Sequence, residues 1–497
     1  MRSVIYILGW ILMIEGVFML LPVGTSLVYH ESQGIAFLIV MTVCAVMGFL
    51  LIRQKPRNIN FYMKEGFVCT ALGWIEMSIF GCLPFVINKE IPSFINALFE
   101  TVSGFTTTGA SILPEVESMS HCSMVWRCFT HWIGGMGVLV FLLAVLPMVG
   151  GSNMQLMKAE SPGPSVGKLV PKVRYTAQIL YYIYFFLTAM EFLLLLCGGM
   201  TVFEALCTSL GTAGTGGFGF RNDSFGSFSP YIQWVVTVFM ILFGVNFNVY
   251  FLLFVGNARD AFRCEEMRWY LGIILAAGLA ITANIYDSAL GLEHNLRNAF
   301  FQVGSIITTT GYSSVDFDLW PSFSKGILVV LMFMGACAGS TGGGLKVSRI
   351  IMSLKAMVAY LRSFLHPRAV RQIRFEGKKV EDSMIHAVLV YFFCAFFIVA
   401  VSLLFVLRDG FDMTTSFTAV AATFNNIGPG LSAVGPMMNY GALSPLTKLV
   451  LIFDMLAGRL EIFPMLMLLY PRLWQELHYE TRRRRIQAEM AEEENRV

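Results

Sequence analysis

VSGFTTTGAS, from Val102 to Ser111, returns almost unchanged as GSIITTTGYS, from Gly304 to Ser313. Both stretches are polar and uncharged, and neither contains a carboxylate, a histidine or a cysteine, so neither resembles a catalytic site. They lie in a chain of 497 residues that is 56% hydrophobic and 13% charged. A run of small hydroxyl groups that recurs in so apolar a chain predicts a structural unit used more than once.

The similarity extends beyond these two stretches as an internal repeat without gaps. The identical pairs are Asn96/Asn298, Ala97/Ala299, Phe99/Phe301, Ser103/Ser305, Thr106/Thr308, Thr107/Thr309, Thr108/Thr310 and Gly109/Gly311. Two fainter copies, FEALCTSLGTAGTGGFG (203–219) and TTSFTAVAATFNNIGPG (414–430), precede later apolar stretches. In this alignment Gly216 and Gly428 are the counterparts of Gly109 and Gly311. The repeat predicts four related units.

The composition indicates a polytopic membrane protein, because soluble domains carry about 25% charged residues and could not hide this much apolar surface. A helix needs about 20 apolar residues to cross a bilayer. Hydropathy predicts about ten such spans. They are residues 3–29, 35–52, 66–87, 123–149, 177–199, 230–256, 268–287, 325–354, 386–407 and 446–470.

Charges alternate between the connections of these spans. The basic residues gather on one side, at Arg53, Lys55, Arg57, Lys64, Lys158, Lys168, Lys172, Arg174, Arg259, Arg263, Arg268, Arg362, Arg368, Arg371, Arg374, Lys378, Lys379 and Arg482–Arg485. The opposite connections carry Glu31, Glu90, Glu115, Glu117, Asp316, Asp318, Asp409 and Asp412. The positive-inside rule therefore predicts that both termini are cytoplasmic.

Each repeat copy is an apolar segment too short to span, which favours a re-entrant helix. We therefore predict an all-α polytopic membrane protein with four pseudo-repeated helix–pore loop–helix units around one pore, preceded by two extra transmembrane helices. The predicted boundaries are 1–65 for the N-terminal helices, 66–150, 151–260, 261–380 and 381–475 for the four units, and 476–497 for a charged cytoplasmic tail.

Non-helical backbone at membrane depth is tolerated where it lines a water-filled cavity or is buried in protein. Four segments dipping from one side can converge on an axis, where rings of carbonyl oxygens replace the hydration shell of potassium. Carboxylates suit strongly hydrated divalent ions better, so their absence favours a potassium filter. The predicted potassium-binding residues are Thr107, Thr108, Gly109, Gly214, Thr215, Gly216, Thr309, Thr310, Gly311, Asn426, Ile427 and Gly428.

A cluster of glycines, GACAGSTGGGLK from Gly335 to Lys346, interrupts the outgoing span of the third unit. Each glycine costs about 1 kcal/mol in a helix, so the segment is expected to unwind into a mobile gating loop. The predicted loop residues are Gly339, Ser340, Thr341, Gly342, Gly343, Gly344 and Lys346. The alternative is close helix packing through small residues.

Arg459, in MLAGRLEIF, lies within the last outgoing span. A charge at the membrane centre costs about 2.5–3.5 kcal/mol on insertion scales, so we expect Arg459 to face the pore as a positive barrier. The alternative is a structural ion pair with Asp454 or Glu461, and both roles can hold together.

Enzyme motifs fail on context. The literal fingerprint at Gly214, Gly216 and Gly219 follows no strand of a βαβ unit. His131 and His386 are isolated and are expected to be core residues. The sequence thus predicts no enzyme activity and no cofactor, with potassium as the transported substrate.

Five motifs, SGFTTTGAS, TGGFG, TTTGYSS, GSTGGGLK and GRLEIF, resemble the Trk/Ktr/HKT superfamily of potassium uptake proteins over nearly the whole chain. The two extra N-terminal helices make the chain similar to the TrkH/TrkG type. The resemblance implies a homodimer with one pore per protomer in the lipid of a bacterial cytoplasmic membrane. It also implies a cytoplasmic TrkA-like nucleotide-binding ring and no nucleic-acid partner. NNIGPG and GTAGTGGFGF depart from the more usual filter segments.

The leading hypothesis is gated potassium uptake, driven by a membrane potential that supplies about 2.3 kcal/mol per charge at 100 mV. The alternative is a potassium/sodium or potassium/proton symporter with alternating access. Such transporters have inverted repeats, whereas the repeats here run in one orientation.

Overall fold

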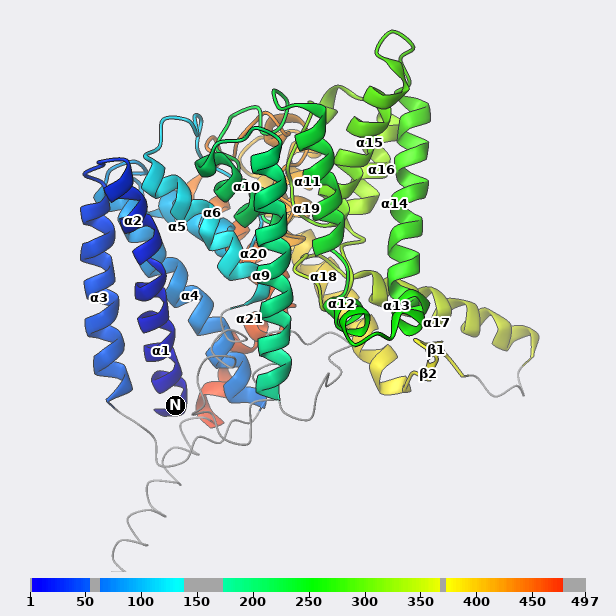
Figure 1. Ribbon diagram of the computed structural model, residues 1–497. Helices are drawn as coiled ribbons and strands as arrows, with labels where there is room; N and C mark the ends of the chain where they lie inside the picture. Colours follow the sequence, from blue (N-terminus) through cyan, green and yellow to red (C-terminus); the bar gives the residue numbers. More distant parts are fainter. Residues whose placement is uncertain (1, 54–62, 138–172, 367–371, 477–497) are drawn as a thin grey trace, which may run out of the picture.

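The computed structural model describes residues 2–53, 63–137, 173–366 and 372–476. These residues are mostly helical, and the strands among them form one antiparallel hairpin of β1 (Arg374–Phe375) with β2 (Lys378–Lys379). Figure 1 shows long helices roughly parallel to one another, with shorter helices inserted at one end. The chain is an all-α polytopic membrane protein.

An N-terminal helical hairpin precedes the repeated units (Figure 1). It consists of α1 (Arg2–Phe18), continued by α2 (Leu20–Val28), and of α3 (Gly34–Ile52). Two glycines bring α1 and α3 together, because a methyl group at Gly9 would lie 2.9 Å from the carbonyl oxygen of Gly48, and one at Gly48 would lie 2.8 Å from that of Gly9. Small residues allow helix backbones this close inside a membrane.

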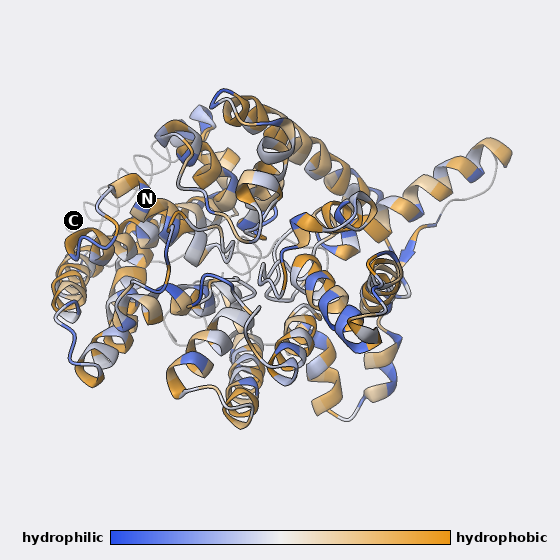
Figure 2. Ribbon diagram, turned by 90° about the horizontal axis from the view of Figure 1, so that it is seen from above, coloured by the Kyte–Doolittle hydropathy of each residue, from blue (hydrophilic) through white to orange (hydrophobic). Residues whose placement is uncertain are grey.

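Four units follow, each with an incoming helix, a short helix and an outgoing segment. Unit one consists of α4 (Met63–Ile87), α5 (Phe94–Phe105) and α6 (His121–Met136). Unit two consists of α9 (Val173–Cys197), α10 (Val202–Gly214), α11 (Pro230–Phe243) and α12 (Phe247–Phe254). Unit three follows the short helix α13 (Ala258–Arg263) and consists of α14 (Glu265–Asn284), α15 (Gly291–Ile307), η1 (Phe317–Leu319), α16 (Ser322–Met332) and α17 (Val347–Leu365), and unit four consists of α18 (Asp382–Leu407), α19 (Met413–Phe424), η2 (Ser432–Val434), α20 (Pro445–Arg459) and α21 (Phe463–Leu468). Viewed from above, the helices surround loops near the middle (Figure 2).

The outgoing segments are broken, which corrects the expectation of single continuous spans over 230–256, 325–354 and 446–470. Helices α11 and α12 meet at a bend of 91°. A non-helical stretch, 333–346, separates α16 from α17, and Glu461 and Ile462 turn the chain between α20 and α21 with φ of 57° and 68°. In unit one, α6 ends before Gly137, which has φ of 78°, and the rest of the predicted span 123–149 lies outside the described residues. By length and composition, six of the described helices can cross a membrane, or seven if the bent pair is one span.

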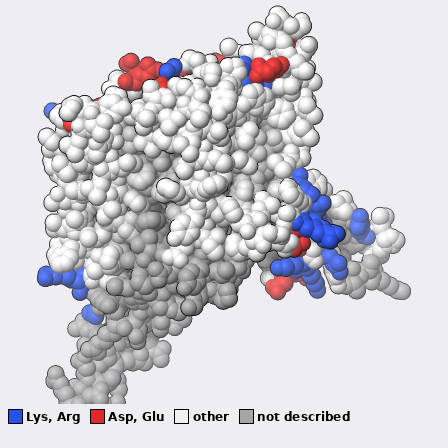
Figure 3. All heavy atoms as spheres, viewed as in Figure 1, with Lys and Arg blue, Asp and Glu red and all other residues white. Residues whose placement is uncertain are grey.

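Acidic and basic side chains gather at opposite ends of the helix bundle. Figure 3 shows acidic side chains at the end that carries the short helices, and basic side chains concentrated at the other end beside α17 and the hairpin. This division has the sense that the sequence predicts. Several of the predicted basic positions lie outside the described residues, namely Lys55, Arg57, Lys158, Lys168, Lys172, Arg368, Arg371 and Arg482–Arg485, as do the boundary at 150/151 and the tail after 476. The unit boundaries stay predictions.

Candidate functional site

The four short helices end in the same hydrogen-bonded turn. In unit one, the N–H of Thr107 donates to the carbonyl of Gly104 (3.1 Å) and the N–H of Thr108 to that of Ser103 (2.8 Å). This pattern is a Schellman motif, which terminates a helix through one left-handed residue. The equivalent bonds are Thr215 to Thr212 and Gly216 to Gly211 in unit two, Thr309 to Ile306 and Thr310 to Ser305 in unit three, and Asn426 to Thr423 and Ile427 to Ala422 in unit four.

The left-handed residue of each turn is not glycine. Thr107, Thr215, Thr309 and Asn426 have φ of 55°, 54°, 61° and 56°. Asparagine tolerates this conformation, but for a β-branched residue it is an outlier, of a kind that costs about 1–3 kcal/mol. Strain of this kind persists only where the surrounding structure fixes the backbone, and it concentrates at functional sites.

The structure corrects the register of the second segment by one residue. The repeat predicts Gly216 as the counterpart of Gly109, but the glycines at positive φ are Gly109, Gly217, Gly311 and Gly428. Gly214, also predicted to bind the ion, is instead the last residue of α10. Gly216 corresponds to Thr108, and it must be small because a Cβ there would lie 2.1 Å from Cγ of His131.

These four glycines close a ring of backbone contacts. A methyl group at Gly109 would lie 2.2 Å from the carbonyl oxygen of Gly216, and one at Gly217 would lie 2.1 Å from that of Thr310. The corresponding distances are 2.0 Å from Gly311 to the oxygen of Ile427 and 2.7 Å from Gly428 to that of Thr108. Each glycine thus abuts the residue that precedes the next glycine, and the fourth returns to the first. We call this arrangement the glycine ring.

A small cavity lies directly against the glycine ring. Its volume is about 120 Å³, and all four ring glycines line it together with side chains such as Ser111, Asn222 and Tyr440. The ring therefore borders open space on this side. The glycine ring brings together all nine predicted filter residues of units one, three and four. From unit two it includes the predicted residues Thr215 and Gly216.

Segments one and three are stabilised by their own threonines. The hydroxyl of Thr106 lies 2.8 Å from that of Thr108, and the hydroxyl of Thr308 lies 2.7 Å from that of Thr310. Thr106 also donates to the carbonyl of Val102 (2.6 Å), as Thr308 does to that of Gly304 (2.6 Å). The first and third threonines of each TTTG run thus support the segment from within.

Segment two lacks these hydroxyls and is held by His131 of α6. The N–H of Phe218 donates to Nε2 of His131 (3.1 Å), so this nitrogen accepts and Nδ1 donates to the carbonyl of Gly104 (2.7 Å). His131 is fully buried, as expected of a core residue, but it links segments one and two. Asn426 does the same for segment four, since its amide donates to the hydroxyl of Thr108 (3.0 Å) and the carbonyl of Met455 (2.9 Å).

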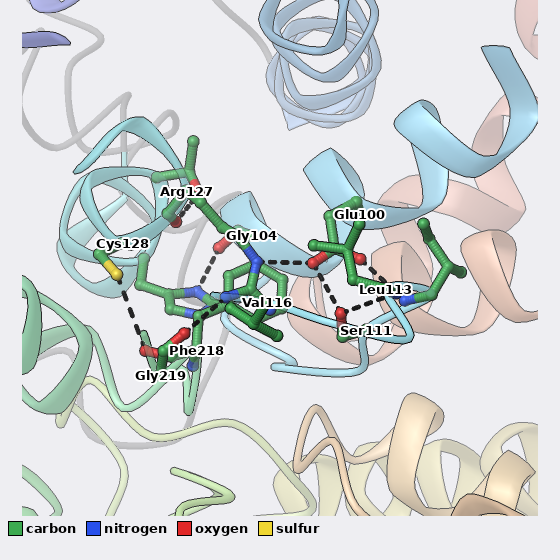
Figure 4. A network of polar contacts seen from close by, with 12 residues as sticks. Glu100, Gly104, Ser111, Leu113, Val116, Arg127, Cys128, Phe218 and Gly219 are labelled. Carbon is green, nitrogen blue, oxygen red and sulfur yellow. Dashed lines mark hydrogen bonds and ion pairs between the residues drawn. The ribbon is translucent and has the colours of Figure 1, made fainter. Parts of the chain in front are cut away.

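A buried ion pair between Glu100 of α5 and Arg127 of α6 also links segments one and two (Figure 4). Nε of Arg127 lies 2.6 Å from Oε1 of Glu100, and its Nη1 donates to the carbonyl of Gly219 (2.8 Å). The guanidinium also stacks 3.6 Å from the ring centre of Phe218. Glu100 accepts from Ser111 Oγ (2.9 Å) as well. The residues predicted from the sequence do not include this pair. The signal that could have found it is a charged residue within each of two apolar stretches, because such charges are costly in a membrane unless they are paired.

The glycine-rich loop lies next to the ring. The N–H of Gly343 donates to the hydroxyl of Thr309 (2.6 Å), and the carbonyl of Gly339 accepts from the N–H of Phe247 at the bend of unit two (2.9 Å). Lys346 Nζ donates to the carbonyl of Gly342 within the loop. The helix is interrupted where the glycines predict. Whether the loop opens and closes stays a prediction.

Both ends of this loop are fixed by Glu266, at the start of α14. Its Oε1 accepts from the N–H of Ala338 (2.8 Å) and from the N–H of Ser348 (3.0 Å). Glu266 is buried, so these charge-assisted bonds are among the stronger ones available. The loop is therefore a short bridge between two anchored ends, and no sequence motif predicts this anchor.

Arg459 crosses between units beside the loop. Its Nη1 donates to the carbonyl of Thr341 (2.9 Å), and its Nη2 donates to the carbonyls of Gly134 and Gly135 (2.8 Å to the latter), at the C-terminal end of α6. The carbonyl end of a helix favours a cation. The two carboxylates that are the alternative partners are engaged elsewhere: Glu461 pairs with Arg349, and Asp454 accepts from Ser402 (2.8 Å).

Comparisons with known proteins give relatives along nearly the whole chain. The family model described as TrkH, cation transport protein, matches residues 32–275 and 267–476. The chain is 36% identical over 485 residues to the Trk system potassium uptake protein TrkH of Salmonella typhimurium, covering 96% of this chain and 99% of that protein. It is 30% identical over 482 residues to TrkG of Escherichia coli, covering 95% and 99%. The crystal structure of the potassium transporter TrkH from Vibrio parahaemolyticus matches with a TM-score of 0.85 and 33% identity, covering 95% of this chain and 99% of that chain.

Proposed function

The chain belongs to the TrkH family of cation transport proteins, and from this premise we propose that it takes up potassium across the cytoplasmic membrane of a bacterium. It is a multi-pass membrane protein and a transport protein, not an enzyme. The names of its relatives, which are potassium uptake proteins of Trk systems, support the substrate.

The observation that carries the proposal is the glycine ring. Four backbone segments with the same left-handed turn meet in a closed cycle, which is the arrangement required if carbonyl oxygens are to surround one ion. Carbonyl rings that replace the hydration shell are the known chemistry of potassium filters. We propose that Thr107–Gly109, Thr215–Gly217, Thr309–Gly311 and Asn426–Gly428 bind the ion. No cofactor is needed, because potassium is the cargo.

The loop and Arg459 are proposed as the gate and the barrier. The loop hydrogen-bonds to Thr309, and Arg459 hydrogen-bonds to the loop, so a charge lies close to the path of any ion leaving the ring. Release of the contact between Arg459 and Thr341 would free the loop on one side. Opening is therefore expected to involve this residue.

The assembly and the topology belong to the same proposal. We infer a homodimer with one pore per protomer, both termini in the cytoplasm and a TrkA-like nucleotide-binding ring as the cytoplasmic partner. The charge division of the molecule supports the orientation. The system names of the relatives support a regulatory partner.

The test is Gly109→Ser in proteoliposomes, with potassium and sodium flux measured under an imposed membrane potential. A side chain at Gly109 would overlap the carbonyl of Gly216, so we expect the preference for potassium over sodium to fall by about 10-fold or more, equivalent to about 1.4 kcal/mol. Gly199→Ser is the matched control, because Gly199 has φ of 89° but a Cβ added there would have no neighbour within 4 Å. Unchanged selectivity in Gly109→Ser would contradict the filter.

The symporter alternative predicts a different dependence on gradients. In a coupled carrier, potassium uptake at fixed membrane potential rises when a proton or sodium gradient is added. In the proposed channel-like mechanism it does not. Rubidium uptake measured with and without each gradient separates the two mechanisms in the unmodified protein.

A further inference from the structure

A second cavity lies at the basic end of the molecule, and none of the ring residues line it. Its volume is about 620 Å³, and α14, α17 and the strand β1 contribute to its wall. Arg362, His366, Arg374 and Lys355 line it, together with the apolar Trp269 and Val358. Cavities of roughly 300–1,000 Å³ are the size that binds small ligands and headgroups.

Two basic side chains of this cavity share one face of α17. Lys355 and Arg362 are seven residues apart, which places them on the same side of the helix. His366 also lines the cavity, directly after the last helical residue, Leu365. Lys355 pairs with Glu265, so its charge is already compensated. Among the described residues, no carboxylate lies within ion-pair distance of Arg362 or Arg374. Two guanidinium groups therefore face the cavity with uncompensated charge.

The hairpin that carries Arg374 is fixed in place. Lys355 Nζ donates to the carbonyl of Arg374 (2.8 Å). Glu376, in the turn, accepts from the N–H of Glu265 (3.1 Å) and from that of Glu266 (3.0 Å), and so caps the first turn of α14. The position of Arg374 is thus set by one hydrogen bond from α17 and two from the start of α14.

The helix around the cavity is apolar and exposed. Phe364 is 68% exposed and Leu361 is 57% exposed, and Leu354, Val358 and Trp269 are also exposed. In Figure 1, α17 extends away from the helix bundle near the hairpin. An apolar helix that bears basic groups, with an aromatic residue nearby, is typical of a segment lying at the boundary of a membrane.

We propose that this cavity binds the phosphate of an anionic phospholipid, with the acyl chains along the exposed face of α17. Arginine pairs with phosphate through two parallel hydrogen bonds, and basic pockets between helices on the cytoplasmic side recognise anionic headgroups. The apolar surroundings favour a lipid over an acidic protein surface. That the lipid belongs to the cytoplasmic leaflet rests on the topology proposed above.

The site adjoins the machinery of the loop without being part of it. Glu265, which pairs with Lys355, is the neighbour of Glu266, whose carboxylate fixes both ends of the glycine-rich loop. A lipid at Arg362 and Arg374 would therefore lie beside the helix start that anchors the loop.

The experiment measures binding of phosphatidylglycerol and of phosphatidylcholine to the full-length protein in detergent, by native mass spectrometry. The test variant is Arg362→Gln with Arg374→Gln. The matched control is Lys378→Gln with Lys379→Gln, which makes the same change of charge at the same hairpin but outside the cavity. We expect the test variant to bind phosphatidylglycerol about 10- to 30-fold more weakly, and the control to bind it as the unmodified protein does. Phosphatidylcholine should bind weakly to all three.

A conservative pair keeps the result interpretable if the glutamine variant folds poorly. Arg362→Lys with Arg374→Lys retains the charge and should keep most of the binding.

Equal binding of phosphatidylglycerol by the test variant and the control overturns the proposal. Equally tight binding of soluble glycerol phosphate also overturns it, because the site would then be one for free anions. A shift of the test variant from dimer to monomer with lipid binding unchanged also overturns it, because a second copy would then cover this face. The readout is lipid binding, so it is independent of potassium flux.

Discussion

The four repeated units are alike at the glycine ring and differ in the outgoing segments that follow it. At the ring, all four units make the same turn, with the same pair of backbone hydrogen bonds and a glycine in the same place. Beyond the ring, the outgoing segments of units two, three and four are broken in three different ways. The breaks are a bend of 91° after Phe243, a non-helical stretch of 333–346 and a tight turn at Glu461 and Ile462.

The proposed function accounts for this contrast. An ion in the proposed ring of carbonyls would contact all four segments at once, so a change in one segment would alter every coordination distance. The proposed gate would need only one element that can move, so the outgoing segments need not be alike. Within the ring, the four segments have the same backbone conformation but are stabilised by different side chains. Threonine hydroxyls stabilise segments one and three, His131 stabilises segment two and the amide of Asn426 stabilises segment four.

The largest expected effect tests the equality of the ring. Gly217→Ala places a methyl group 2.1 Å from the carbonyl of Thr310 and forces a side chain into φ of 81°. The overlap must open the ring, and we expect potassium flux per folded molecule to fall by about 100-fold, equivalent to about 2.7 kcal/mol. Flux in proteoliposomes, normalised to folded protein, measures this.

Gly219→Ala is the control for this variant. Gly219 is two residues away, but a methyl group there would have no neighbour closer than 3.6 Å. Flux close to that of the unmodified protein is expected. If the two variants behaved alike, the ring register assigned to unit two would be wrong.

The next effect addresses the outgoing segments, which differ among the units. Arg459→Gln removes the charge but keeps a polar side chain with an amide donor. If the charge is the barrier, potassium flux should rise by about 10-fold, the effect of lowering a barrier by about 1.4 kcal/mol. Single-channel recording or rubidium flux in liposomes measures the change.

Arg459→Lys retains the charge and should conduct within about twofold of the unmodified protein, a difference of less than about 0.5 kcal/mol. A lower yield of folded Arg459→Gln with unchanged flux per molecule would instead favour a purely structural role. The two variants together separate charge from packing.

The smallest expected effect concerns a carboxylate outside the membrane spans, on the side of the ring. Glu31 follows α2 and accepts from the N–H of His121 (2.8 Å) and from that of Cys122 (3.0 Å), in the first turn of α6. Glu31→Gln should lower the free energy of unfolding by about 1 kcal/mol or less, the usual size of such a helix-terminal charge. Thermal unfolding in detergent at pH 7 measures this loss.

The pH dependence of this variant has a definite sign. Burial raises the pKa of the Glu31 carboxyl, but the hydrogen bonds from Cys122 and His121 outweigh it and hold the pKa below its ordinary value of 4.5. The stabilisation is therefore present above pH 4.5 and is lost as the pH falls through the lower folded-state value. The difference in melting temperature between Glu31→Gln and the unmodified protein should shrink on acidification. Glu115→Gln, in an exposed loop, should differ little at any pH.

Much of the site could be predicted because the repeat is a local pattern. The gap-free match between Asn96–Gly109 and Asn298–Gly311 places two ring segments, and a left-handed glycine after a threonine run needs nothing beyond its own neighbours. The prediction was wrong in the second segment because Gly216 and Gly217 stand side by side and both must be small. A Cβ at Gly216 would overlap the ring of His131 and one at Gly217 would overlap the carbonyl of Thr310, and only the packed units show which of the two is the ring glycine.

The sequence by itself determined that this chain is a membrane protein of four related units, because hydropathy and repetition depend on the order of residues alone. The tertiary structure alone decided which partners hold those units together. Glu100 and Arg127, His131 and Phe218, and Glu266 and Ala338 are 27, 87 and 72 residues apart. Such hydrogen bonds form only once the helices pack, because burial away from water leaves each polar group dependent on the one partner within reach.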